Sequence, residues 1–177
     1  SYLVWCESTH QAGVVDASVN ITKIIEFIEI HDLKLEKVLI THTHSDHVHF
    51  LDDILYQFPN VQVCVYEKSE LELGRHYRKL SHHEIISIGS EIITTLHTPG
   101  HYPDSLCFWV KKENNLFTGD TMFVGRTGRT VDEKSNIRHL YNSIYNQILQ
   151  LSDITTISPG HHYGYTPNIT LKENILL

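Results

Sequence analysis

The chain has 177 residues and a mass of 20.5 kDa, a size typical of one globular domain spanning residues 1–177 with both ends short or trimmed. Hydrophobic residues make up 41% and charged residues 20% of the chain, a composition that supports a folded core and excludes disorder. The formal net charge is −7 without a basic block, which argues against nucleic-acid and anionic-membrane partners. No membrane span or signal peptide is recognisable, so we expect a cytoplasmic protein.

Strand and helix signals alternate along the first half of the chain. Apolar runs predict strands at Tyr2–Cys6, Ala12–Asp16 and Val38–Ile40, and alternating valines predict another over residues 61–65. Two amphipathic helices are expected, one beginning after Asn20 as its N-cap and one ending at Pro59. Their apolar residues have the i, i+3, i+4, i+7 spacing of a single helix face: Ile21, Ile24, Ile25 and Ile28 in the first, and Leu51, Ile54, Leu55 and Phe58 in the second.

The second half contains mainly strand signals. Two hairpins are predicted: Ile85–Ile88 with Ile92–Leu96, and Ser105–Val110 with Leu116–Thr118. They are followed by a helix, a strand and the start of another helix: a helical stripe from Ile137 to Ile148, a strand at Ile154–Ser158, and a final helix from Leu171. Because strands outnumber helices and helices occur in both halves, we expect an α/β protein with β-sheets flanked by helices.

The three cysteines, Cys6, Cys64 and Cys107, are far apart in the sequence, and each lies in an apolar run. An odd number of buried, scattered cysteines is typical of free thiols in a reducing compartment.

Histidine is unusually concentrated in one segment, which follows directly on a predicted buried strand. Residues 41–47 read Thr-His-Thr-His-Ser-Asp-His and contain four potential metal ligands: His42, His44, Asp46 and His47. Alternate side chains leaving a strand point to the same side, so His42 and His44 can face one ion. Imidazole and carboxylate together suit Zn²⁺, Fe²⁺ or Mn²⁺.

Three further potential ligands, His101, Asp120 and His161, each come immediately after a glycine at the end of a predicted strand. Glycine allows the sharp turn and the close backbone approach that such a position needs. Because four separate strands end in ligand-type side chains, the pattern predicts one metal site assembled from distant parts of the chain.

The order His42-x-His44-x-Asp46-His47, then His101, Asp120 and His161, resembles the metallo-β-lactamase superfamily over nearly the whole chain, from Val14 to His161. Three segments are also similar to its glyoxalase II-like branch, the hydroxyacylglutathione hydrolases: residues 98–101, 117–123 and 125–130. The resemblance implies a four-layer α/β/β/α sandwich with its metal site along one edge, between the two sheets.

The resemblance also implies a role for each residue. His42, His44 and His101 would bind a first ion. Asp46, His47 and His161 would bind a second, with Asp120 bridging the two and Asp16 supporting the site from behind. Two divalent ions, zinc in preference to iron or manganese, would supply a metal-bound hydroxide for hydrolysis, and Asp46 and Asp120 would be the catalytic carboxylates. Three histidines, His49, His97 and His162, match no such role.

We expect a small-molecule substrate, a thioester such as an acyl-glutathione, and leave the oligomeric state open. Arg126 and Arg129 could clamp a substrate carboxylate, and Tyr163 could line the pocket. One alternative is a persulfide dioxygenase, because the loop after Asp120 and residues 141–144 are also similar to that class. Such an enzyme would hold one iron on the positions matching His42, His101 and Asp120. A non-catalytic metal-binding module is a second alternative.

Overall fold

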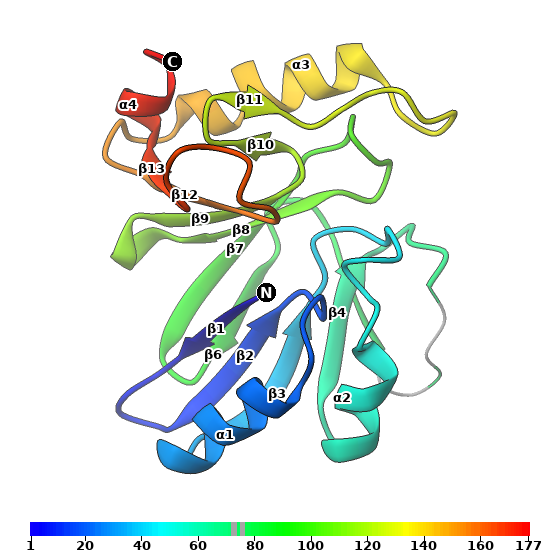
Figure 1. The fold of residues 1–177 in the computed structure, drawn as a ribbon, viewed down its shortest axis with the longest axis vertical. Helices are drawn as coiled ribbons and strands as arrows, with labels where there is room; N and C mark the ends of the chain where they lie inside the picture. The colour runs from blue at the N-terminus through cyan, green and yellow to red at the C-terminus, as the bar shows by residue number, and fades with distance from the viewer. Residues whose placement is uncertain (72–73, 75–76) are drawn as a thin grey trace.

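The computed structural model describes residues 1–71, 74 and 77–177, and its chain forms two large sheets that lie face to face (Figure 1). The first sheet has the order β1-β2-β3-β4-β5, built from Tyr2–Trp5, Gln11–Val15, Lys34–Leu39, Gln62–Tyr66 and Tyr77–Leu80. The second has the order β13-β12-β9-β8-β7-β6, built from Ile169–Thr170, Thr156–Pro159, Asn115–Gly119, Leu106–Val110, Glu91–His97 and Ile85–Ile88. A separate hairpin pairs β10, Met122–Phe123, with β11, Arg126–Thr127.

Helices cover the outer faces of both sheets. Figure 1 shows α1 (Thr22–Ile30) and α2 (Leu51–Gln57) on the first sheet, and α3 (Ile137–Tyr145) and α4 (Leu171–Asn174) on the side of the second. Three buried apolar clusters separate these four layers. They contain Ile28 and Val38 beneath α1, Leu39 and Phe108 between the sheets, and Leu140 and Ile157 beneath α3. The predicted four-layer α/β/β/α sandwich is therefore confirmed.

The alternation of strand side chains explains this layering. Val38 and Leu39 are neighbours in β3, yet they lie in different clusters, because successive side chains of a strand point to opposite faces. Both predicted hairpins are present. Ile88 pairs with Glu91 across the first, and Phe108 pairs with Phe117 across the second.

Several elements differ from the prediction in extent. The N-cap position of α1 is Ile21, although Asn20 still accepts a hydrogen bond from the backbone N–H of Thr22 at 2.9 Å. The stripe that predicts a helix as far as Ile148 is interrupted, because α3 ends at Tyr145 and Ile148 begins a separate 3₁₀ turn. Ile148 is nevertheless fully buried in the third cluster, which accounts for its place in the apolar pattern.

Two expectations from composition can be checked against the structure. All three cysteines are buried and free, as predicted. Among the described residues, no helix is long and apolar enough to cross a membrane.

Candidate metal centre

The strand directions bring the predicted site residues to one edge of the sandwich. Strands β9 and β12 are parallel, and Gly119 pairs with Pro159 at their ends, so Asp120 and His161 leave the sheet close together. Strand β7 runs in the same direction as β9, since both are antiparallel to β8, and the loop after β7 carries His101. In the first sheet the parallel β2 and β3 end beside each other and lead into Asp16 and residues 41–47.

One group of ring nitrogens converges from two of these loops. His44 Nδ1 lies 3.0 Å from His42 Nε2 and 3.0 Å from His101 Nε2. His42 and His101 are buried, and His101 Nδ1 lies 2.8 Å from the Arg129 carbonyl, so it donates there and leaves Nε2 as the acceptor facing the group. Three nitrogens at these separations could hold one metal ion.

A second group forms beside the first. His161 Nε2 lies 3.1 Å from Asp46 Oδ2, and His47 Nε2 lies 3.9 Å from the same oxygen. Asp46, His47 and His161 could likewise hold one ion. Gly160 permits this approach, since a Cβ there would collide with the side chains of Asp120 and His47.

Asp120 lies between the two groups. Its Oδ1 is 3.2 Å from His47 Nε2, and its Oδ2 is 3.7 Å from His101 Nε2 and 3.5 Å from His161 Nε2. It is therefore the carboxylate that faces histidines of both groups. The seven side chains predicted to be ligands thus come together in space.

Asp16 lies behind the site and is buried. Its carboxylate accepts hydrogen bonds from the backbone N–H of Thr41 at 2.7 Å, the Thr41 hydroxyl at 2.8 Å and His47 Nδ1 at 2.8 Å. Because His47 donates from Nδ1, its Nε2 is turned toward Asp120. Asp16 itself has a φ of +59°, an uncommon backbone conformation for a residue other than glycine.

The protonation states of the site side chains reflect their burial and the charges of their neighbours. Burial, followed by neighbouring imidazoles, lowers the pKa of His42 well below 6.5, so its ring is a neutral acceptor. Burial alone would lower the pKa of His47, but the carboxylates of Asp120 and Asp16 outweigh it and raise the pKa to about 10. Burial would raise the pKa of Asp120, yet His47 and the other nearby imidazoles lower it, which keeps the carboxylate ionised.

The donor set fits a divalent cation. His47 Nε2 and Asp120 Oδ1 are buried and have no hydrogen-bond partner in the described part of the chain, although they are 3.2 Å apart. In this arrangement the two atoms attract each other as an ion pair, in which the proton of His47 takes the place that a cation would occupy. A divalent cation could be bound by both atoms at once. No hydrogen bond within the described residues satisfies either atom.

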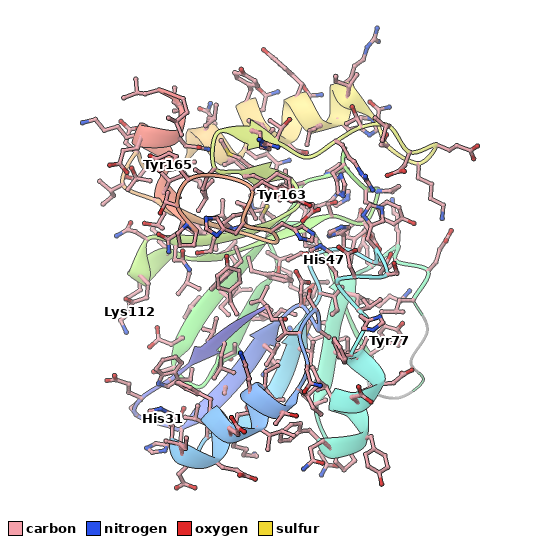
Figure 2. The ribbon with its side chains drawn as sticks, viewed as in Figure 1. His31, His47, Tyr77, Lys112, Tyr163 and Tyr165 are labelled. Atoms are coloured by element: carbon pink, nitrogen blue, oxygen red, sulfur yellow. The ribbon has the colours of Figure 1, made fainter. Side chains whose placement is uncertain are left out.

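A cavity of about 500 Å³ opens in front of these groups. Its lining includes Asp46, Asp120 and His161 from the site, together with the three residues predicted to contact substrate: Arg126, Arg129 and Tyr163. The Tyr163 ring stacks on His161 with centroids 5.1 Å apart, and the Arg126 guanidinium lies over Tyr163 at 5.8 Å. Figure 2 shows His47 and Tyr163, which come from opposite halves of the chain, at the level where the two halves of the sandwich meet.

The structure adds two acidic residues that the sequence pattern does not single out. Asp104 is buried and accepts from the backbone N–H of Thr43 at 3.3 Å and from its hydroxyl at 2.7 Å, so it ties the loop of His101 to residues 41–47. Asp132 lines the cavity, with Oδ2 3.9 Å from His44 Nε2. The position of Asp104 three residues after His101 is the only sequence signal for its role.

The histidines without a predicted role lie outside the ligand groups. His97 stacks on Tyr66 with centroids 3.8 Å apart, and its Nε2 donates to the Pro103 carbonyl at 2.9 Å. His49 and His162 are exposed.

Comparison with known proteins decides the family. Residues 1–165 match the model of the metallo-beta-lactamase superfamily. The chain belongs to this superfamily. A probable polyketide biosynthesis zinc-dependent hydrolase, PksB of Bacillus subtilis, is 31% identical over 97% of this chain and 76% of its own length.

Two other relatives are a hydroxyacylglutathione hydrolase and a probable one. A hydroxyacylglutathione hydrolase of Francisella tularensis subsp. novicida is 35% identical over 78% of this chain, and a probable one of Schizosaccharomyces pombe is 35% identical over 92%. The chain spans only 54% and 63% of the lengths of these two relatives.

Among solved structures, ETHE1 from Myxococcus xanthus has a TM-score of 0.84 at 26% identity over 97% of this chain and 74% of its own. The BLEG-1 B3 metallo-beta-lactamase has a TM-score of 0.86 over 99% of this chain and 90% of its own, at 24% identity, and so supports the fold alone.

Proposed function

We propose that this superfamily member is a dinuclear metal-dependent hydrolase that cleaves a thioester such as an acyl-glutathione. The observation that carries the proposal is the pair of adjacent ligand groups joined by Asp120 at the base of an open cavity. His42, His44 and His101 would hold the first ion and Asp46, His47 and His161 the second, with Asp120 contacting both. Zinc is the preferred metal, and a zinc-dependent hydrolase is among the relatives.

When bound, two divalent ions polarise a carbonyl and lower the pKa of a water to near neutrality, which supplies the nucleophile for hydrolysis. The chain contributes the arrangement around that chemistry. Asp46 is 56% exposed at the cavity, so its carboxylate could orient an attacking water by accepting a hydrogen bond from it. Asp120, buried and ionised, neutralises positive charge between the two groups and fixes their spacing.

Substrate recognition would come from residues of the cavity wall that are not ligands. Arg126 and Arg129 both line the cavity, and in the described chain neither guanidinium makes a side-chain hydrogen bond or ion pair. Guanidinium groups bind carboxylates through paired, charge-assisted hydrogen bonds, and glutathione carries two carboxylates. The hydroxyacylglutathione hydrolases among the relatives support this substrate class.

The function is tested on the purified chain by metal analysis together with two assays. The first follows thiol release from an acyl-glutathione thioester, and the second follows oxygen uptake with glutathione persulfide. We expect two bound ions and thioester hydrolysis. Persulfide oxidation with a single iron would instead support the alternative that the ETHE1 structure raises.

Replacing Arg129 by Ala should raise the KM for an acyl-glutathione about 10-fold or more while kcat changes little, because a charge-assisted contact to a part of the substrate that does not react contributes about 1.5–3 kcal/mol of uniform binding. The backbone carbonyl of Arg129, which accepts from His101, is retained in this variant. Steady-state kinetics measure the effect. The control is Arg138→Ala on the exposed side of α3, and a fall in kcat without a change in KM would contradict the assignment.

Replacing Asp16 by Asn should weaken metal binding roughly 10- to 100-fold, the usual effect of losing a carboxylate that orients a histidine ligand. Asp16 accepts three hydrogen bonds through its two oxygens: from the Thr41 backbone N–H, the Thr41 hydroxyl and His47 Nδ1. An amide has only one acceptor oxygen, so the asparagine variant cannot accept all three. Competition with a chelating dye measures the affinity, and the control is His49→Ala, which removes an exposed histidine two positions after His47. Unchanged affinity for both ions would rule out the supporting role of Asp16.

A further inference from the structure

The β10–β11 hairpin carries part of the substrate wall but has little stability of its own. It consists of two pairs of residues joined by a two-residue turn, and Phe123 pairs with Arg126 next to that turn. Both of these residues line the cavity. An isolated hairpin of this length is not stable in water, so other parts of the chain must hold its shape.

Asn174 in α4 holds the turn of this hairpin. Its Nδ2 donates to the Phe123 carbonyl at 3.1 Å, and its Oδ1 accepts from the Gly125 backbone N–H at 2.7 Å. Gly125 has a φ of +72°, a conformation that favours glycine, and the amide of Asn174 therefore bonds to the backbone on both sides of this turn. Asn174 is 7% exposed, so water does not compete for these two hydrogen bonds.

The position of Asn174 is itself well defined. Helix α4 begins with a capping box, in which the Thr170 hydroxyl donates to Glu173 at 2.7 Å and accepts from the Glu173 backbone N–H at 3.3 Å. Leu171, 1% exposed, anchors the helix in the third apolar cluster. The strand end of the hairpin is held separately, because Met122 and Val124 lie in the same apolar cluster and the Thr118 hydroxyl donates to the Met122 carbonyl at 2.7 Å. Asn174 adds the hydrogen bonds at the turn, next to Arg126.

Arg126 directly follows the turn that Asn174 holds. Its guanidinium lies over the Tyr163 ring at 5.8 Å, and within the described residues no hydrogen bond or ion pair holds it. We propose that Asn174 is a positioning residue for anionic substrates, which fixes the hairpin so that Arg126 faces the cavity over Tyr163. The inference rests on the proposed function, since it assigns Arg126 to the binding of a substrate anion.

The test compares Asn174→Ala with Asn142→Ala, which removes the same side chain from the exposed face of α3. Asn174→Ala should speed amide hydrogen exchange at Gly125 and Arg126. It should also raise the KM for an acyl-glutathione on the order of 2- to 12-fold, the cost of ordering one long side chain on binding. Metal content, kcat and the KM for a neutral N-acetylcysteamine thioester should stay unchanged.

Three further variants exclude a merely structural role. Asn174→Asp keeps the acceptor for Gly125 but sets an oxygen against the Phe123 carbonyl, so it should speed exchange and raise KM at least as much as Asn174→Ala. Asn174→Gln keeps both amide groups on a longer side chain, so it should lie between wild type and Asn174→Ala, and it takes over the test if the alanine variant does not fold. In an Arg126→Ala background, Asn174→Ala should add nothing to KM. An equal rise in KM for both substrates, an additive effect in that background, or unchanged exchange would each overturn the proposal.

A binding measurement distinguishes a failure of the proposed function from a failure of the role proposed for Asn174. If the wild type hydrolyses neither thioester, binding of a non-hydrolysable S-alkylglutathione is measured by calorimetry on the same variants. Weaker binding in Asn174→Ala but not in Asn142→Ala supports the role of Asn174. Equal binding in both, or no binding by the wild type, overturns it.

Discussion

Asp120→Asn is expected to lower kcat roughly 10²-fold or more, as the removal of a key electrostatic group from an active site does. The substitution keeps the size of the side chain and removes its charge. One oxygen of Asp120 faces His47, and the other faces His101 and His161. If Asp120 binds both ions, its replacement weakens the binding of each of them. We expect loss of at least one ion together with the loss of turnover.

The measurement is steady-state kinetics with metal content determined in the same samples. Asp153→Asn, an exposed carboxylate outside the cavity, is the matched control and should change neither quantity. If Asp120→Asn kept two ions and a near-normal kcat, the bridging role and the hydrolytic mechanism built on it would have to be abandoned.

Much of the layered fold can be predicted from residue periodicity. Ile24 and Ile28 are spaced for one helix face, and both lie in the first apolar cluster. The turn at Gly89–Ser90 between two apolar runs predicts the β6–β7 hairpin, in which Ile88 pairs with Glu91 across that turn. These features depend on local sequence, which is why they can be recognised without knowledge of the rest of the chain.

Other elements owe their structure to distant partners. Strand β5, with sequence Tyr-Arg-Lys-Leu, lacks apolar alternation and forms because it pairs in parallel with β4. Strands β10, β11 and β13 have two residues each, too few for any periodic signal. The extension of the predicted helix to Ile148 is wrong for a different reason. Ile148 is buried in a separate 3₁₀ turn, and a buried turn places apolar residues at a spacing similar to that of a helix.

The convergence of the seven candidate ligands follows from one rule, that side chains at the ends of similarly directed strands meet at one edge. The supporting residues follow no such rule. Asp104 contacts Thr43 across 61 positions, and Asn174 contacts Gly125 across 49. A lone Asp in a loop or Asn near a helix end is common in any sequence, so only the three-dimensional contacts distinguish these two.

His161→Ala is expected to separate the two-ion hydrolase from the one-iron alternative. In the hydrolase, His161 and Asp46 belong to the second ligand group, with His161 Nε2 3.1 Å from Asp46 Oδ2. Removing the imidazole should leave one ion per chain and lower thioesterase kcat roughly 10²-fold or more, because half of the two-ion arrangement is lost. In the one-iron alternative, the metal is held by His42, His101 and Asp120, and His161 is not a ligand.

The adjacent His162 gives a matched control, because it is the same residue type one position further on and is exposed. His162→Ala should keep both ions and the wild-type kcat, which excludes a general effect of changing this loop. Metal analysis, thiol release and oxygen uptake with glutathione persulfide are measured on both variants. If His161→Ala retained one iron and full persulfide oxidation, as the unchanged protein did, the chain would be a dioxygenase and the second ligand group would have no metal-binding role.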